Sequence, residues 1–562
     1  MAESGNTPYS YHTFILPFAW KAYKEEESYT KFVEYFENNK FWDCTDMENS
    51  NDINTVKILN TPEEKKMFYK EYQYFFSHAR KAIYGFDEKI VRNFSFRYKD
   101  IHNKARLKIT KNKKGYSLSI NAIRLKIYNT GIALYILECE NYKEIIEKEK
   151  QKENKNHEYS LEDLLRLNDV MDINDYGRRI MLPFIPNCPE DSIAAEKLEI
   201  FFDENNKKAD ITSDFEAFID NFNSGQISMN HIGDVVKDIL NYPSSGGRVF
   251  TSKKADNEDE IWIYPLLGDR MYVLSCIDDK YNVGRFLEKT DTGIYRYKED
   301  TKIASDLYKL AYVDNSKDVS CQDDEMLQDL LDEALYRRWL KYGSLYFVTN
   351  YSFIFLGTDL QKNSYLKDNF LTQYYQMFCL ALAQRASIAL FKRRIAAISS
   401  EFDKRRIKSQ KKTMEKIMSL EEEYSAFESQ LCFEEVSPEQ QGIEIYDMLK
   451  KQLRLKEEEE SLKGQIESLF NIANNYSEYE NNSLMYAITV IAFVVSIASL
   501  LISSMQIEAF RKKVNETVGS VIGREIKFEV PFVFGIVIMS VLAAIIGFVV
   551  WRIKRRKKIR NM

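Results

Sequence analysis

The sequence lacks the short motifs that mark common catalytic and nucleotide-hydrolysing sites. Its 562 residues contain no GxxxxGK[ST], GxGxxG, HExxH or GxSxG pattern, and none of the five histidines has a partner at metal-ligand spacing. The cysteines are odd in number, form no CxxC pair and are scattered singly: Cys44, Cys139, Cys188, Cys276, Cys321, Cys379 and Cys432. This spacing favours reduced thiols over disulfides or a zinc site. We therefore expect no enzyme, no cofactor and no metal site, although a catalytic site built from dispersed residues stays open.

Two long segments near the C-terminus lack Asp, Glu, Lys, Arg and His altogether. Asn481–Ile507 covers 27 residues and Val530–Trp551 covers 22. A bilayer core of ~30 Å needs about 20 apolar residues of helix. We therefore expect transmembrane helices at about 484–505 and 530–551. Both segments lie far from the N-terminal position of a secretory signal.

A block of positive charge follows the second apolar segment. Arg552–Arg560 contains seven cations and no acid, and such blocks stay on the cytoplasmic side of a membrane. Because two spans return the chain to its starting side, we expect a multi-pass protein of the inner (cell) membrane with both termini cytoplasmic. The net charge of the chain is −6, so the rest carries about −13 (−6 minus 7). This balance argues against direct nucleic-acid binding.

The sequence pattern divides the chain into three parts. Residues 1–371 mix strand and helix patterns, and we expect an α/β (mixed α+β) cytoplasmic ligand-sensing domain there, which could divide into subdomains at about 1–160 and 161–371. Residues 372–480 are charged, contain few Gly or Pro and predict a long helical stalk. Residues 481–562 complete the chain with a two-helix transmembrane hairpin and the basic tail.

Two stretches of the first part predict strands most clearly. Ser117–Glu140 has two β-branched, apolar runs around Asn129-Thr130-Gly131, which is typical of a hairpin. Further on, the apolar runs Ile261–Leu267 and Met271–Cys276 flank the polar turn Gly268-Asp269-Arg270. This second arrangement predicts a buried hairpin or strand pair.

The stalk pattern contains one interruption. Phe433–Gly442 includes Pro438 and Gly442, so we expect two long helices separated there. In the second helix an apolar residue recurs every seven positions, which predicts a partner helix: Met448, Leu455, Leu462 and Leu469, with Ile466 and Ala473 in a neighbouring row. This helix leads almost directly into the first apolar segment, so a movement of the soluble domain could be transmitted into the membrane.

A stripe of small residues follows one face of the first expected span. Spacings of three and four place these residues together on a helix: Thr489, Ala492, Ser496, Ser499 and Ser503. One interpretation is a narrow, uncharged pore lining, which requires an oligomer because two spans cannot enclose a channel. The other is close helix–helix packing, for which membrane helices favour small residues. The stripe alone leaves both open.

Three polar clusters are candidates for binding an anionic ligand. Arg178 and Arg179 follow Gly177, Asp269 and Arg270 lie in the turn described above, and Ser244–Arg248 is a flexible, donor-rich loop. Arginine forks suit phosphate, and an aspartate can accept from ribose or amine groups. Taken alone, each cluster is more simply explained as a surface salt bridge or an ordinary turn.

Several segments resemble a known family, with the same order along the chain and the same C-terminal arrangement of stalk, span, loop, span and basic tail. The matching segments are Tyr11–Phe18, Leu125–Ile132, Ile173–Ile180, Gly268–Val273 and Arg338–Tyr346. They resemble the CorA-type two-span channels, and within these the CorA-like effectors associated with type III CRISPR systems. The resemblance covers most of the chain.

The resemblance implies a homopentamer whose first span lines a pore. It also implies a nucleotide second messenger, an S-adenosylmethionine–AMP conjugate, and makes Arg178, Arg179, Asp269 and Arg270 its expected contacts. Members of the main family end the first span with a Gly-Met-Asn tripeptide that selects hydrated magnesium. Here the corresponding stretch is Leu501–Glu508 and lacks the tripeptide, which argues against magnesium transport.

Three hypotheses follow. The favoured one is a ligand-gated homo-oligomeric membrane channel of type III CRISPR antiviral defence, activated when an adenine-nucleotide messenger binds the cytoplasmic domain. The second is a constitutive CorA-type divalent cation (magnesium) transporter. The third is a non-conducting, membrane-anchored receptor.

Overall fold

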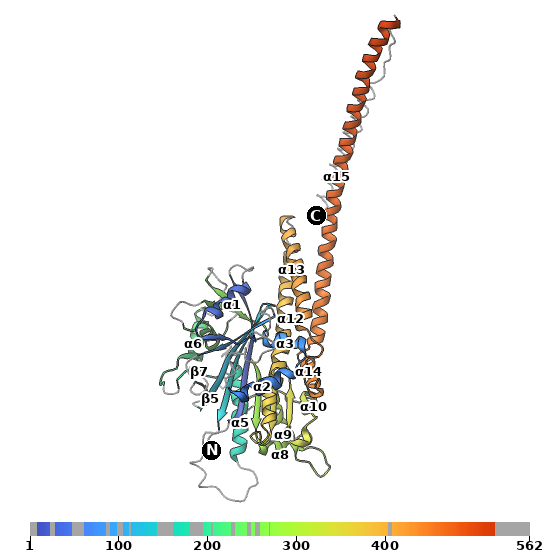
Figure 1. Ribbon diagram of the computed structural model, residues 1–562. Helices are drawn as coiled ribbons and strands as arrows, with labels where there is room; N and C mark the ends of the chain where they lie inside the picture. Colours follow the sequence, from blue (N-terminus) through green and yellow to red (C-terminus); the bar gives the residue numbers. More distant parts are fainter. Residues whose placement is uncertain are drawn as a thin grey trace. The chain divides into compact units, whose positions relative to one another are not determined.

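The protein is represented by a computed structural model, shown in Figure 1. It describes the following residues: 8–22, 28–47, 61–85, 90–97, 105–111, 114–142, 161–179, 195–203, 206–225, 231–243, 249–252, 259–268, 270–317, 319–402 and 407–522. These form two compact units. The first draws on Met1–Arg394 and Glu422–Lys463, and the second on Ile395–Glu421 and Gly464–Met562.

The first unit contains a large mixed sheet, which counts 14 strands within the described residues. Its main path runs β12-β13-β14-β11-β1-β6-β5-β4-β7-β8, with β10 beside β1, β9 beside β10, and β2 and β3 joined to β5. All neighbours pair antiparallel except β11 with β14 and β9 with β10. The strands are β1 (Pro8–Ala22), β2 (Trp42–Cys44), β3 (Val91–Phe96), β4 (Arg106–Lys111), β5 (Lys114–Tyr128), β6 (Ile132–Tyr142), β7 (Lys197–Phe201), β8 (Ile211–Asp214), β9 (Phe250–Thr251), β10 (Ile261–Pro265), β11 (Tyr272–Asp278), β12 (Leu335–Tyr336), β13 (Leu345–Val348) and β14 (Ser352–Gly357).

Helices are interspersed with the strands of this sheet along the chain, so the mixed α/β class expected from the sequence is confirmed. The helices named below belong to both units. One sheet draws strands from both sides of residue 160, and the two ranges considered as subdomains share it. The helices are α1 (Ser28–Asn38), α2 (Pro62–Gln73), α3 (Ser77–Tyr84), α5 (Leu161–Arg178), α6 (Phe215–Asn223), α7 (Asp234–Leu240), α8 (Lys280–Leu287), α9 (Thr301–Tyr312), α10 (Asp324–Ala334), α11 (Ser364–Asn369), α12 (Tyr375–Phe402), α13 (Ile407–Leu431), α14 (Gln440–Gln452) and α15 (Leu455–Ile522).

Strand β1 lies at the centre of the sheet. One of its edges pairs with β6, and the other pairs with two strands in succession, β11 along Ser10–Ile15 and β10 along Phe18–Ala22. The gap between these two partners falls at Leu16 and Pro17. Proline has no N–H to donate, so it suits a position of the strand at which one neighbour is missing.

This arrangement corrects one expectation. The strands expected on either side of Gly268-Asp269-Arg270 exist as β10 and β11, but they do not form a hairpin with each other, because each pairs with a different part of β1. The expected hairpin around Asn129-Thr130-Gly131 is confirmed: β5 and β6 pair antiparallel, and Gly131 has a φ of 93°. Such a positive φ favours glycine, which has no side chain to clash.

The helical region contains more breaks than the sequence predicts. The expected interruption at Phe433–Gly442 is confirmed, since α13 ends at Leu431 and α14 begins at Gln440. A further turn follows at Leu453 and Arg454, where Arg454 has a φ of 51°. Met448 therefore lies on α14, whereas the rest of the predicted stripe lies on α15 and is buried: Leu455, Leu462, Ile466, Leu469 and Ala473.

Helix α15 is continuous over 68 residues and contains the first apolar segment. In the part of the chain that the structure describes, no helix reaches the combination of length and apolar character that crossing a membrane requires. The span expected at 530–551 and the basic tail lie outside the described residues. The transmembrane hairpin therefore stays a prediction.

Candidate functional site

The C-terminal end of α5 packs directly on the central strand. A Cβ atom at Gly177 would lie 2.2 Å from Cζ of Phe14 on β1, so only glycine lets the helix come this close. The helix also contacts β11 and α9. As a result, the polar residues of its last turn are placed against the middle of the sheet.

Arg178 and Arg179 converge on one buried carboxylate. Oδ1 of Asp175 lies 3.1 Å from Nη2 of Arg178 and 3.1 Å from Nε of Arg179. All three side chains are at most 4% exposed. Of the alternatives for this cluster, a salt bridge at the surface does not hold, because these ion pairs are almost completely shielded from water.

Arg270 joins the same cluster from a distant part of the chain. The N–H of Met271 donates to the carbonyl of Arg178 at 2.7 Å, which fixes the segment before β11 against the end of α5. Burial is the main influence on the two helical arginines: it lowers the pKa of Arg178 and lowers that of Arg179 to about 10, and the positive charge of Arg270 adds to both decreases. We call Asp175, Arg178, Arg179 and Arg270 the arginine cluster.

Charged groups of both signs act on Arg178. Asp175 and the nearby Asp314 oppose the decrease in its pKa, whereas Arg270 adds to that decrease. In addition, Oδ2 of Asp175 and Nδ2 of Asn174 are buried without a hydrogen-bond partner among the residues that the structure describes. Guanidinium donors of this kind can bind a phosphate or carboxylate, and a carboxylate oxygen can accept from a hydroxyl or amine.

A buried polar network, which the sequence does not reveal, connects β1 and β11 to the residue beside the cluster on α5. Nδ1 of His12 lies 2.7 Å from Oδ1 of Asn174 and 3.1 Å from Oγ of Ser275, and its Nε2 lies 2.8 Å from Oγ of Ser10. Because Asn174 Oδ1 can only accept, His12 donates through Nδ1 and its Nε2 accepts from Ser10. Strand β1 thereby fixes the residue that precedes Asp175.

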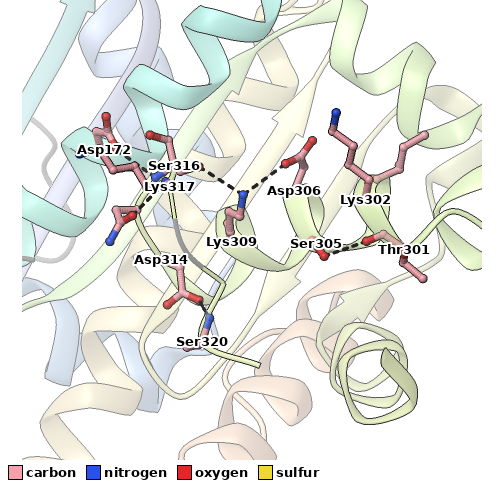
Figure 2. A network of polar contacts seen from close by, with 12 residues as sticks. Asp172, Thr301, Lys302, Ser305, Asp306, Lys309, Asp314, Ser316, Lys317 and Ser320 are labelled. Atoms are coloured by element: carbon pink, nitrogen blue, oxygen red, sulfur yellow. Dashed lines mark hydrogen bonds and ion pairs between the residues drawn. The ribbon is translucent and has the colours of Figure 1, made fainter. Parts of the chain in front are cut away.

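A loop that follows α9 borders the same end of α5 (Figure 2). The carboxylate of Asp172 accepts from the N–H of Ser316 at 2.9 Å and from the hydroxyl of Tyr116 at 2.7 Å. Lys309 donates to the carbonyl of Ser316 at 3.2 Å, and Asp314 accepts from the N–H of Ser320 at 2.7 Å. These bonds hold Asp314 close enough to influence Arg178.

One expected ligand contact and one of the candidate clusters lie outside the described residues. Asp269 lies outside the described residues, as does the loop Ser244–Arg248. The structure thus brings together three of the four expected contacts, Arg178, Arg179 and Arg270. It adds Asn174 and Asp175, and their position beside the arginines along α5 is the only sequence signal that could have found them.

The small residues expected to line a pore lie along α15. The side chains of Thr489, Ala492, Ser496 and Ser499 are exposed, whereas that of Ser503 lies outside the described part. Three hydroxyls donate to the carbonyl four residues earlier, from Thr489 at 2.7 Å, Ser496 at 2.8 Å and Ser499 at 2.9 Å. The O–H donors of these hydroxyls are therefore satisfied inside the helix.

Large apolar side chains surround this stripe and are exposed as well. They are Met485, Tyr486, Ile488, Ile491, Phe493 and Val495, each at least 50% exposed. A contiguous apolar surface of this kind marks a region that contacts lipid or another protein chain. We call these six residues the apolar belt of α15.

Comparisons with known proteins do not place the chain in a family. No model of a protein family, no curated protein and no solved structure matches it. Within the described residues, His, Cys, Asp and Glu side chains form no group of three or more that could hold a metal ion.

Proposed function

We propose that the protein is a ligand-gated, homo-oligomeric membrane channel of type III CRISPR antiviral defence. An adenine-nucleotide messenger of the S-adenosylmethionine–AMP type binds at the arginine cluster of the cytoplasmic domain. Binding changes the packing of the stalk helices and opens a pore lined by the small residues of α15. The observation that carries the proposal is the convergence of Arg178 and Arg179 on one buried carboxylate, with the charge of Arg270 close enough to lower the pKa of both.

The electrostatics of the cluster support a phosphate ligand. Burial lowers the pKa of Arg179 to about 10, because removal from water disfavours its charged form. A bound anion would favour the charged form again. A bound phosphate would accept two-point hydrogen bonds from these guanidinium groups, which arginine forms with particular strength. Binding energy of this origin is available to shift a conformational equilibrium only if the ligand prefers the open state.

The helical region supports a route from the cluster to a membrane. Helix α15 joins the buried stalk residues to the apolar belt within one helix. Moving a gate from 1% to 99% open needs a preference of about 5.5 kcal/mol for the open state. Five protomers that each bind a messenger would reach this value with about 1 kcal/mol each.

The first test measures binding and ion flux with the same variants. The Arg178→Gln/Arg179→Gln double variant should bind the messenger at least 10- to 100-fold more weakly than the wild type, because each charge-assisted hydrogen bond contributes about 1.5–3 kcal/mol. Messenger-dependent flux through liposomes should be lost in parallel. Binding is measured by calorimetry on the detergent-solubilised full chain.

Two controls keep the result interpretable. Asp175→Asn/Arg179→Gln removes one charge of each sign and so leaves no additional unpaired charge, yet it should still weaken binding. Arg97→Ala removes an arginine that is 74% exposed and should change neither measurement. Wild-type flux that is identical with and without messenger would exclude gating, and messenger binding without flux would indicate a non-conducting receptor.

A further inference from the structure

Tyr351 lies beside the arginine cluster on a tightly bonded turn between β13 and β14. Oγ1 of Thr349 accepts from the N–H of Tyr351 and from that of Ser352, both at 3.1 Å. The N–H of Thr349 donates to the carbonyl of Ser352 at 2.9 Å, and the Ser352 hydroxyl donates to the carbonyl of Ala311. The backbone that carries the tyrosine is therefore fixed.

The segment that precedes and begins β11 holds both Tyr351 and Arg178. The N–H of Met271 donates to the carbonyl of Arg178 at 2.7 Å, and the N–H of Val273 donates to the carbonyl of Tyr351 at 3.0 Å. The guanidinium of Arg178 consequently lies 5.7 Å from the centre of the Tyr351 ring. This distance is close to the outer limit of a cation–π contact.

The two side chains differ sharply in exposure. Arg178 is 3% exposed, whereas Tyr351 is 44% exposed. An anion held by the buried arginines would thus have an accessible aromatic ring as its neighbour. Aromatic side chains stack on nucleobases, whereas phosphate and sugar offer no flat apolar face.

We propose that Tyr351 stacks on the base of the bound nucleotide while the arginine cluster holds its phosphate. The inference rests on the proposed function, since it names a further contact of the same site. It also assigns a division of tasks: the arginines provide affinity for any phosphate, and Tyr351 provides preference for a ligand that carries a base. A purine, with the larger aromatic face, gains most from this contact.

The test compares two probes that share a sugar and a phosphate. AMP carries a base and ribose 5-phosphate does not. In the wild type AMP should bind more tightly than ribose 5-phosphate, and Tyr351→Leu should lower the affinity for AMP roughly 5- to 150-fold, the range expected for one stacked base. The affinity for ribose 5-phosphate should not change. Calorimetry on the full chain measures both.

Two further variants separate stacking from other effects. Tyr351→Phe keeps the aromatic face and should retain most of the affinity for AMP. Tyr69→Leu replaces a tyrosine on α2 that is 58% exposed and should leave both affinities unchanged.

The outcomes distinguish the inference from the proposed function. Equal affinities of the wild type for both probes, or an equal loss of both in Tyr351→Leu, would overturn base stacking and leave the phosphate site intact. If neither AMP nor ribose 5-phosphate binds, base stacking and the phosphate site are both overturned. Selective loss of AMP binding in Tyr351→Leu, with retention in Tyr351→Phe, supports the assignment.

Discussion

A buried histidine connects the arginine cluster to the central strand of the sheet. His12 is 1% exposed, and burial lowers its pKa to about 4, although its bond to Asn174 opposes the decrease. In the unfolded chain the ring titrates near 6.5. Between these two values the unfolded state holds a proton that the folded state lacks, so His12 makes the protein less stable as the pH falls from about 6.5 towards 4.

This sign gives a prediction for His12→Gln. Between pH 6.5 and pH 5 the wild type should lose about 1.6 kcal/mol more stability than the variant, because the slope approaches its limit of about 1.4 kcal/mol per pH unit only below pH 6.5. Urea unfolding at a series of pH values measures the two slopes. His231, whose pKa burial also lowers to about 4, contributes to both slopes and cancels in the comparison. Equal slopes would show that His12 is not held neutral.

For single residues, the sequence indicates which polar side chains are candidates for the site, but not which residues they contact in the fold. Arg178, Arg179 and Arg270 stand out as polar residues beside glycines, and all three belong to the cluster. His12 and Tyr351 give no comparable signal, because each acquires its role from residues more than 150 positions away. Long-range packing, which no local pattern encodes, decides which polar side chains become buried together.

Among the elements, the β5–β6 hairpin connects the sheet to the helical region. The hydroxyl of Thr130 at its tip lies 2.7 Å from that of Ser387 on α12, and both residues are buried. The neighbouring Asn129 donates to Oε1 of Gln430 on α13 at 3.0 Å. The turn that the sequence predicts therefore also serves as a contact between the sheet and two stalk helices.

The contact at Thr130 can be measured with a double-mutant cycle. Thr130→Val alone should destabilise the protein by about 1–2 kcal/mol, because it leaves the Ser387 hydroxyl buried without this partner. Thr130→Val combined with Ser387→Ala should cost less than the sum of the single changes, with a coupling of about 1 kcal/mol. Thermal unfolding of the four proteins gives the energies, and strictly additive effects would contradict the bond.

The elements also show where prediction from sequence ends. Asn129-Thr130-Gly131 specifies a hairpin locally, so β5 and β6 could be predicted together. The strands β10 and β11 could be predicted, but not their pairing, because both pair with a strand about 250 residues earlier. The turn at Leu453 and Arg454 contains neither glycine nor proline, and nothing in the sequence marks it.

For the molecule as a whole, the apolar belt of α15 decides whether the proposed function can hold. Ile491→Lys/Phe493→Lys places two charges where we propose lipid, and each lysine costs about 2.5–3.5 kcal/mol in the centre of a membrane helix. The variant should shift from the membrane fraction to the soluble or aggregated fraction. Ile472→Lys, at a 50% exposed position of the same helix, should stay in the membrane.

Alkaline extraction of membranes followed by immunoblotting measures this distribution. Retention of the double-lysine variant in the membrane, at the level of Ile472→Lys, would contradict insertion of this part of α15. Together with the flux measurements, the result separates an inserted channel from a protein that uses the belt to contact another chain.

The central position of β1 also constrains how the chain is made. This strand is synthesised before its partner β11, which follows roughly 260 residues later, and β14 beyond it follows later still. At about 5–20 residues per second, translation needs on the order of 13 to 50 seconds to supply β11. During this interval an apolar strand edge remains available to other nascent chains. Successful biogenesis therefore depends on shielding the β1–β6 pair until β11 has been synthesised.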